Sequence, residues 1–228
     1  MDEVEKIKER YERRKRLPKD LYSIFNFGNL FIYQERERKT LELLSKYGLD
    51  SLTNKRTLDV GCGRGSFLRD FIQLGARPEN LYGIDLLEEN IKGARQINPN
   101  INFICGNAEN LDFPDKNFDI VLQSTCFTSI FDIEMKKRIA GEMFRVLKDE
   151  GIILWYDFRY NNPKNPDVKG IEKKEIKALF PNCKYDFNLI TLAPPIVRRL
   201  APLSWFLCEI LEIIPFLRTH YLVVISKK

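Results

Sequence analysis

Short, continuous runs of apolar residues alternate with amphipathic segments through the middle of the chain. Continuous apolar runs are typical of strands covered on both faces of a parallel sheet, because a strand with one wet face would alternate. The segment 133–147 shows the other pattern, with Ile139, Met143 and Val146 at the spacing of one buried helix face. The predicted strands are 57–60, 81–84, 102–105, 118–123 and 151–157, and the predicted helices are 66–74, 88–97, 133–147 and 170–180. This order predicts an α/β fold with helices on both faces of the sheet.

The N-terminal end of the chain does not follow this alternation. Residues 2–16 predict a charged helix, which a proline soon afterwards ends. An aromatic, turn-like segment follows at 20–30, and 31–47 predicts a second helix that stops at Gly48. We therefore expect a helical extension ahead of the sheet.

The C-terminal end also differs from the middle. Two predicted strands, 185–192 and 221–226, flank a predicted helix at 200–214. No internal repeat or low-complexity linker interrupts the chain, so we expect one domain over residues 1–228. Its three parts are a helical N-terminal cap (1–50), a cofactor-binding core (51–160) and a substrate-side C-terminal part (161–228).

The most informative local pattern is a glycine turn at the end of the first predicted strand, where residues 57–66 read TLDVGCGRGS. Gly61, Gly63 and Gly65 lack a Cβ, so the backbone can adopt positive φ angles and approach a ligand closely. A helix opens directly afterwards, and its first amides point at the same place. Asp85 follows the last of these glycines by 20 residues. Its carboxylate can accept both hydroxyl hydrogens of a ribose.

This pairing of a glycine turn with a carboxylate predicts a nucleotide-like cofactor at the edge of the sheet. A dinucleotide is one alternative, but Ser66 stands where a nicotinamide fingerprint has glycine. Asp59 lies just before the turn, where a carboxylate suits a cationic ligand and would repel a pyrophosphate. A purely structural glycine turn is the other alternative.

Several motifs in the same order resemble the class I S-adenosylmethionine (SAM)-dependent methyltransferases. The resembling segments are 58–65, 82–85, 107–108, 113–121 and 145–154. The first is similar to the family's glycine motif, and Asp85 is similar to its ribose-binding acid. Asn107-Ala108 resembles the adenine-side motif, which is usually Asp-Ala; the amide oxygen of Asn107 can still meet the adenine amino group. The last two segments resemble the family's approaches to its fourth and fifth strands.

The resemblance implies a Rossmann-like, doubly wound, mostly parallel sheet of seven strands, whose last strand runs antiparallel beside the fifth. It implies SAM as cofactor and S-adenosylhomocysteine as product. Ligands of such sheets bind outside the carboxyl ends of the strands. The implied cofactor-binding residues are Asp59, Gly61, Cys62, Gly63, Gly65, Asp85, Leu86, Asn107, Ala108 and Gln123.

The methyl group of SAM sits on a sulfonium, so the protein mainly has to hold an acceptor in line and exclude water. A general base helps a hydroxyl or amine acceptor. Asp157, which closes the fifth strand, and His220, the only histidine, are the two candidate catalytic residues. The alternatives for Asp157 are an ion pair with Arg159 or the capping of a loop. The alternative for His220 is a structural role. Cys126 follows the fourth strand but lacks the Pro-Cys signature of cytosine-C5 methyltransferases.

Composition and charge narrow the remaining possibilities. The chain has 228 residues, 44% hydrophobic and 30% charged, which is ordinary for a soluble globular protein. The net charge of +5 is concentrated in the run 13–16, which acids on the same helix balance, so we interpret it as a solvated face. The Asn/Asp-Pro-Pro-Tyr signature of amino-group DNA methyltransferases is absent, so a nucleic-acid partner is not expected.

The cysteines and the N-terminus bear on metal binding and location. Five scattered cysteines, without a CxxC or Cys/His cluster, predict no metal site. Free thiols and an N-terminus without an apolar signal segment predict a cytoplasmic location.

The segment 200–217, which contains the predicted helix 200–214, is apolar and long enough to suggest a membrane span. Glu209 and Glu212 lie inside it, and a carboxylate at mid-membrane costs about 2.5–3.5 kcal/mol, so an integral membrane segment is not expected. The two acids share one predicted face and apolar residues fill the other, which predicts an amphipathic helix. It could pack on the protein's own core, form an oligomer interface, cover an apolar substrate, or touch a membrane peripherally.

The sequence therefore predicts a SAM-dependent methyltransferase that moves a methyl group to a hydroxyl or amine of a small molecule or sugar by metal-independent, in-line transfer. We expect the substrate pocket to draw on the aromatic segment 22–33, the loop 161–166 and the helix 200–214. The alternatives are a methyltransferase that acts on a lipid or quinone at the membrane surface and a SAM-binding protein without catalysis.

Overall fold

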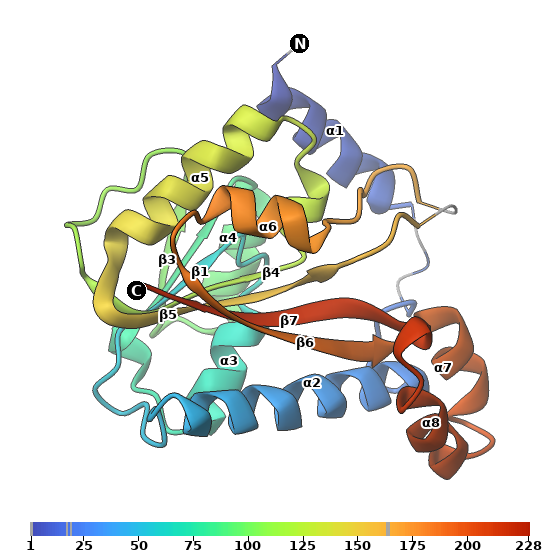
Figure 1. The fold of residues 1–228 in the computed structure, drawn as a ribbon. Helices are drawn as coiled ribbons and strands as arrows, with labels where there is room; N and C mark the ends of the chain where they lie inside the picture. Colours follow the sequence, from blue (N-terminus) through green and yellow to red (C-terminus); the bar gives the residue numbers. More distant parts are fainter. Residues whose placement is uncertain (1, 17, 19, 163–164) are drawn as a thin grey trace.

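A seven-stranded sheet in the order β3-β2-β1-β4-β5-β7-β6 forms the centre of the molecule in the computed structural model (Figure 1). The structure describes residues 2–16, 18, 20–162 and 165–228. The strands are β1 (Thr57–Val60), β2 (Leu81–Asp85), β3 (Asn102–Cys105), β4 (Phe118–Ser124), β5 (Leu147–Phe158), β6 (Lys184–Leu192) and β7 (Arg218–Ser226). β7 runs antiparallel to both of its neighbours, and the pairs among β1–β5 are parallel. The predicted mostly parallel sheet, with an antiparallel last strand beside the fifth, is confirmed.

Helices cover both faces of this sheet, as predicted. The helices are α1 (Glu3–Arg14), α2 (Phe27–Lys46), α3 (Ser66–Gln73), α4 (Glu88–Ile97), α5 (Ile133–Val146), α6 (Lys173–Leu179), α7 (Pro194–Leu200) and α8 (Trp205–Glu212). Three short 3-10 helices are η1 (Pro78–Asn80), η2 (Phe127–Ser129) and η3 (Pro215–Leu217). One core lies between the sheet and α1, α5 and α6, and the other lies between the sheet and α2, α3 and α4.

Successive side chains of β5 enter opposite cores, because side chains alternate along a strand. Trp155 packs with α5 and α6, whereas its neighbours Leu154 and Tyr156 pack on the α2 side. All three are buried, which is why the strand reads as a continuous apolar run. The division of the chain into one domain with three parts stays a prediction.

Helix α2 begins at Phe27, four residues earlier than the sequence predicts. The side chain of Asn26 caps it by accepting a hydrogen bond from the Gly28 amide at 3.0 Å. Gly28 lies inside this first turn because the backbone of α7 packs directly against it. The asparagine and glycine that indicated a turn therefore belong to a helix start and a close helix contact.

The prediction of a single helix over 200–214 is wrong. α7 ends at Leu200, and Ser204 caps the separate helix α8 by accepting from the Leu207 amide at 3.2 Å. The sequence left open which way the apolar side chains of this region turn, and in the structure Phe206 and Ile213 are 70% exposed. Among the described residues, no helix combines the length and apolarity needed to cross a bilayer.

Glu212, which the sequence places on one face with Glu209, lies half-buried near Glu35 of α2, whereas Glu209 is exposed. Glu35 is buried, and its carboxylate accepts from the Thr191 amide at 2.6 Å. Burial raises the pKa of both carboxyl groups, and the charge of Glu212 raises the pKa of Glu35 further. α8 is thus docked by Glu212, by the buried Cys208 and by Trp205 and Leu211, which pack beside Cys208. Phe206 and Ile210 turn outward.

The close contact between α2 and α7 predicts a large effect of one glycine substitution. A Cβ at Gly28 would lie 2.6 Å from the backbone nitrogen of Arg198. Gly28→Ala should lower the free energy of unfolding in urea by about 1–3 kcal/mol. Gly141→Ala on α5, where a Cβ meets nothing within 4 Å, is the matched control and should raise it by about 0.5–1 kcal/mol. Equal effects of the two substitutions would contradict the close packing of α7 on α2.

Candidate cofactor and active site

The glycine turn after β1 lies beside the end of β2, as the parallel register of the two strands requires. The Gly61 amide donates to the carbonyl of Ile84 at 2.8 Å, and the Gly63 amide donates to Oδ2 of Asp85 at 2.8 Å. Gly61, Gly63 and Gly65 have φ angles of 74°, 55° and 72°, the left-handed region that favours glycine. The predicted turn is therefore built as expected.

Asp85 is held in one orientation by three donors. Oδ1 accepts from the Leu87 amide at 2.9 Å and from the side-chain amide of Asn90 at 3.0 Å, while Oδ2 accepts from Gly63. The residue is 8% exposed. Each carboxylate oxygen can accept about two hydrogen bonds, so Oδ2 keeps capacity for a hydroxyl donor.

A hollow lies over the carboxyl ends of β1, β2 and β3. The predicted cofactor residues that line it are Gly61, Asp85, Leu86, Asn107 and Ala108. Much of the remaining wall is apolar and comes from α1 and α5 and from the segment after β4. The structure thus brings together predicted residues from three separate strand ends.

Helix α1 roofs this hollow, which the sequence does not reveal. Ile7 and Tyr11 line it, and the buried Arg10 anchors the helix. Arg10 donates to Oε1 of Glu3 at 2.8 Å and to the carbonyl of Ser129 at 3.1 Å. These contacts join α1 to the segment after β4.

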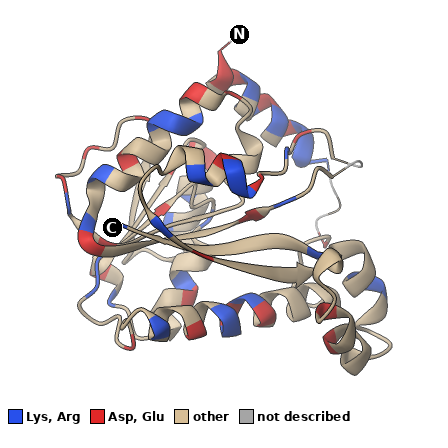
Figure 2. Ribbon diagram, in the orientation of Figure 1, with Lys and Arg blue, Asp and Glu red and all other residues tan. Residues whose placement is uncertain are grey.

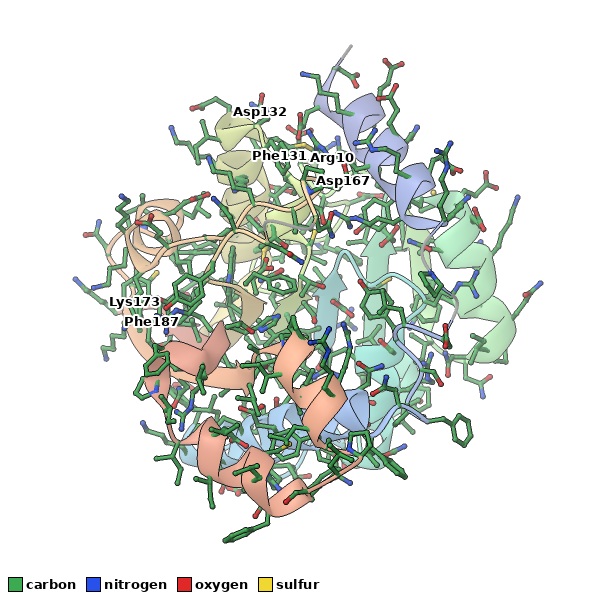
Figure 3. All side chains as sticks on the ribbon, turned by 90° about the vertical axis from the view of Figure 1, so that its right-hand side faces the viewer. Arg10, Phe131, Asp132, Asp167, Lys173 and Phe187 are labelled. Atoms are coloured by element: carbon green, nitrogen blue, oxygen red, sulfur yellow. The ribbon has the colours of Figure 1, made fainter. Side chains whose placement is uncertain are left out.

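Further contacts of Arg10, Arg13 and Arg14 hold α1 in place. Arg10 lies 3.8 Å above the ring of Phe131, and Figure 3 shows the two side chains together at the top of the molecule. Arg13 and Arg14 both bind Asp167, in the connection between β5 and α6, through its carboxylate and its carbonyl respectively. The roof is therefore clamped to the segments that follow both β4 and β5. Of the loop 161–166, residues 163 and 164 lie outside the described part.

Other predicted cofactor residues serve the framework around the hollow. Gly65 packs against the ring of Phe103, which a Cβ would meet at 2.5 Å. Cys62 is buried beneath Gly83. Gln123 is fully buried, and its side-chain oxygen accepts from the Cys126 amide at 3.1 Å. Neither Cys62 nor Gln123 lines the hollow.

Asn107 lines the hollow but is engaged within its own turn. Its side-chain oxygen accepts from the Glu109 amide at 3.1 Å, and its side-chain nitrogen donates to the Glu109 carboxylate at 2.7 Å. The turn fixes the direction of the Asn107 side chain. A role of its oxygen toward adenine stays a prediction.

Asp59 lies on the α2 face of β1, and its Oδ1 has no hydrogen-bond partner among the described residues. Burial and then the charge of Asp85 raise the pKa of Asp59 well above its usual range, while Arg36 acts in the opposite direction. A buried, unpartnered carboxyl oxygen requires an explanation, and a ligand donor is one. The predicted preference for a cation is consistent with this position.

Arg36 of α2 is a neighbour of this carboxylate that the sequence reasoning missed. Its guanidinium lies 4.6 Å above the ring of Phe67 and 5.5 Å from that of Tyr156, with Asp70 3.4 Å away. No local motif marks this residue, because it belongs to a charged helix and reaches the site only through the packing of α2 on α3.

The two candidate catalytic residues lie on opposite faces of the sheet. Asp157 packs toward η2, and its carboxylate accepts from the Thr128 amide at 3.2 Å and from the Phe158 amide at 3.0 Å. Burial raises its pKa to about 7, against the effect of these hydrogen bonds. The alternative ion pair with Arg159 does not form.

His220 lies on the α2 side, stacked on Tyr156 at 4.7 Å. Its Nδ1 is 2.9 Å from the hydroxyl of Thr219. Burial, with a smaller effect of Arg36, lowers its pKa to about 3. Neither His220 nor Asp157 lines the hollow itself. In the part of the chain that the structure describes, no three His, Cys, Asp or Glu side chains are grouped to hold a metal.

Comparison with known proteins places this geometry in a family. Residues 58–155 match a family described as a methyltransferase domain. A fatty-acid O-methyltransferase of Mycolicibacterium smegmatis is 30% identical over 175 residues, covering 69% of this chain and 60% of the relative. A phthiotriol/phenolphthiotriol dimycocerosates methyltransferase of Mycobacterium ulcerans is 34% identical over 116 residues, covering 49% and 40% respectively. The chain spans about half the length of these curated relatives.

The fold is also similar to that of solved structures. A SAM-dependent methyltransferase from Archaeoglobus fulgidus matches with a TM-score of 0.58 at 20% identity, covering 87% of this chain and 98% of that one. At this identity the likeness concerns the fold, including the sheet and the helices on both of its faces.

The clamped roof predicts how the thiol of Cys126 reacts. Cys126 is half-buried in the hollow beneath α1, and burial together with the charges of Asp85 and Asp157 raises its thiol pKa. Arg10→Ala removes the hydrogen bonds that this side chain of α1 donates to the carbonyl of Ser129 and to Glu3, so the roof should open more often. We expect modification of Cys126 by a thiol reagent, followed by peptide mass spectrometry, to accelerate about tenfold or more. The exposed Cys105 serves as the internal reference.

Lys116→Ala removes an exposed ion pair with Asp149 and is the control for this measurement. It should leave the Cys126 rate unchanged. An unchanged rate in Arg10→Ala as well would show that α1 does not limit access to the hollow.

Proposed function

Since the chain belongs to the class I SAM-dependent methyltransferases, we propose that it transfers the methyl group of SAM to a hydroxyl or amine of a small molecule. The observation that carries this proposal is the position of Asp85. Its carboxylate is oriented by three donors at a largely apolar hollow, as recognition of a ribose beside a buried base requires. Five free cysteines support a reducing, cytoplasmic setting.

The residues of the hollow fit SAM. Asp85 would accept the ribose hydroxyls, Asn107 and Ala108 would border the adenine, and Ile7 and Tyr11 of the roof would exclude water. The unpartnered oxygen of Asp59 suits a cationic donor of the methionine end. SAM supplies a methyl group bonded to a sulfonium sulfur. Once the methyl is transferred, this sulfur is a neutral thioether.

The acceptor would enter beside the ends of β4 and β5, where Asp157 and Thr128 lie together. With a pKa raised to about 7, Asp157 is partly ionised at neutral pH and can take a proton from a hydroxyl or ammonium group. His220, with a pKa near 3 and on the other face, is a weak base in the wrong place. We therefore assign the base to Asp157 and expect transfer without a metal ion.

An apolar acceptor agrees best with the surroundings. Ile130, Met135 and Ile139 line the hollow next to the segment after β4. One of the relatives is named for a fatty acid. A lipid or quinone acceptor at a membrane surface is the second candidate, and the exposed apolar side chains of α8 favour it. A SAM-binding protein without catalysis would bind SAM and methylate no member of an acceptor panel.

The role of Asp85 predicts a loss of affinity on its removal. Asp85→Ala should weaken SAM binding by roughly 1.5–3 kcal/mol, which is about 10- to 150-fold in the dissociation constant, because hydrogen bonds to a charged acceptor disappear. Isothermal titration calorimetry measures it, with circular dichroism as a check on folding. Asp115→Ala, at an exposed carboxylate that pairs with Arg145, is the matched control and should bind SAM like the wild type. Unchanged affinity in Asp85→Ala would rule out the proposed cofactor position.

The role of Asp157 predicts the pH dependence of turnover. A base must be unprotonated to act, so kcat should rise with pH through about 7 and fall below it as the carboxyl takes up a proton. Transfer of labelled methyl to the best acceptor from a panel of fatty acids, alkyl alcohols and alkylamines provides the rate. Asp157→Asn should lower kcat about 100-fold and flatten the profile while SAM still binds.

His220→Gln is the matched control, since it alters the other candidate base. It should leave the shape of the pH profile unchanged. If His220→Gln flattens the profile and Asp157→Asn does not, the assignment of the base is reversed.

A further inference from the structure

Helix α8 carries large apolar side chains on its outer surface. Phe206, Ile210 and Ile213 recur at helical spacing and are 70%, 42% and 70% exposed; we name them the α8 stripe. Phe216 of η3, 71% exposed, and Leu203, 83% exposed, lie at the two ends of the helix. The inward side of α8 is already occupied, because Cys208 is fully buried there. An exposed set of this kind marks an interaction site or an aggregation hazard.

A second group of exposed apolar side chains lies in the loop before α2. Tyr22, Ile24, Phe25 and Phe27 are 70%, 50%, 92% and 54% exposed, and we name them the 22–27 loop. The two groups are far apart in sequence, but both contact α7. Arg198 of α7 donates to the side-chain oxygen of Asn29 at 2.8 Å and lies 5.5 Å above the ring of Tyr22, and α7 in turn contacts α8.

Both groups lie at the end of the molecule toward which the carboxyl ends of β5 and β6 point. In Figure 1, β5 and β6 point toward the end where α7 and α8 lie. Figure 3 looks onto this end and shows α1, the roof of the hollow, at the top, with the C-terminal helices at the bottom. The exposed apolar side chains are therefore on the same end of the molecule as the candidate site.

Exposed basic side chains lie on segments at the same end of the molecule as the two apolar groups. Arg16 after α1, Lys169 before α6 and Arg199 on α7 are exposed, and none forms an ion pair within the described residues. The exposed acids of the neighbouring segments include Asp20 and Glu209, together with Glu12 and Glu172, which pair with Lys15 and Lys174. Glu212 is turned inward. Figure 2 shows α2 striped with both signs of charge, whereas the only charged positions of α8 are the acids Glu209 and Glu212.

We propose that the α8 stripe and the 22–27 loop dock this end of the protein on an anionic lipid bilayer. The apolar side chains would enter the headgroup boundary, and Arg16, Lys169 and Arg199 would contact lipid phosphates. Highly exposed aromatic and aliphatic side chains next to unpaired basic ones are the features that interfacial membrane binding uses. Docking of this kind stands independently of the proposed methyl transfer, although it would bring the candidate site close to apolar molecules in the bilayer.

The charges and the shape favour a bilayer over a second copy of the chain. A twofold interface centred on α7 and α8 would bring Arg199 close to its own counterpart, where like charges repel. A bilayer offers anionic groups at the level of these cations and apolar chains beyond them. It also accommodates two separate protruding groups without requiring a matching surface.

Co-sedimentation of the full chain with sucrose-loaded vesicles tests the proposal. Vesicles of phosphatidylcholine alone are compared with vesicles containing 7:3 phosphatidylcholine and phosphatidylglycerol. We expect the wild type to bind the anionic vesicles about tenfold or more tightly and to lose that preference in high salt. The double variant Phe206→Ser/Ile213→Ser should bind them at least about tenfold more weakly, because it removes the centre of the stripe.

The matched control is Phe144→Ser/Ile97→Ser, which removes one exposed phenylalanine and one exposed isoleucine from α5 and α4. It should bind vesicles like the wild type. Phe25→Ser tests the 22–27 loop separately and decides the outcome if the double variant fails to fold. Calorimetry with SAM should give the wild-type affinity for each variant, because none of these residues lines the hollow.

Three results would overturn the proposal. The wild type could fail to bind anionic vesicles, or the stripe and control variants could bind them equally. Light scattering could instead show a dimer that Phe206→Ser/Ile213→Ser makes monomeric while vesicle binding is unchanged, which would assign the stripe to a second copy. If the wild type does not bind SAM, the proposed function is refuted, and the vesicle experiment still decides whether this end docks on a bilayer.

Discussion

The buried carboxylate of Asp85 is the interaction on which the geometry of the site depends. A buried charge is costly unless donors compensate it, and here the amides of Gly63 and Leu87 and the side chain of Asn90 do so. These three donors belong to the glycine turn after β1 and to the start of α4, so one side chain joins two βα connections. The parallel pairing of β1 and β2 provides the register for it. The same oxygens face the hollow, which is why a structural contact and a ribose-recognition contact coincide in one residue.

The sheet and the glycine turn could be predicted from the sequence because their signals are local: continuous apolar runs, and glycines where φ is positive. The roof could not, since it depends on Arg10 reaching the carbonyl of Ser129, 119 residues away. Helical periodicity likewise shows that α8 has two faces but not which one turns inward. That choice is made by the docking of Cys208 and by the pairing of Glu212 with Glu35, contacts between segments that are distant in the chain.

The candidate bases illustrate how burial decides chemistry that residue type leaves open. Asp157 and His220 lie on adjacent, antiparallel strands, where Phe158 pairs with His220. Side chains alternate along strands, so the two groups nevertheless face opposite cores. Burial disfavours the charged form of each, which moves the carboxyl pKa up to about 7 and the imidazole pKa down to about 3. The residue whose ordinary pKa is near neutrality is thereby unsuited to act as the base, and the aspartate becomes suited to it.

Binding of SAM in the hollow beside Asp85 can be measured by calorimetric titration of the unmodified protein. S-adenosylhomocysteine and NADH are titrated under the same conditions, because the glycine turn alone would also be compatible with a dinucleotide. We expect micromolar binding of SAM and S-adenosylhomocysteine and no heat of binding with NADH. Binding of NADH, or absence of binding by both SAM and S-adenosylhomocysteine, would contradict this expectation.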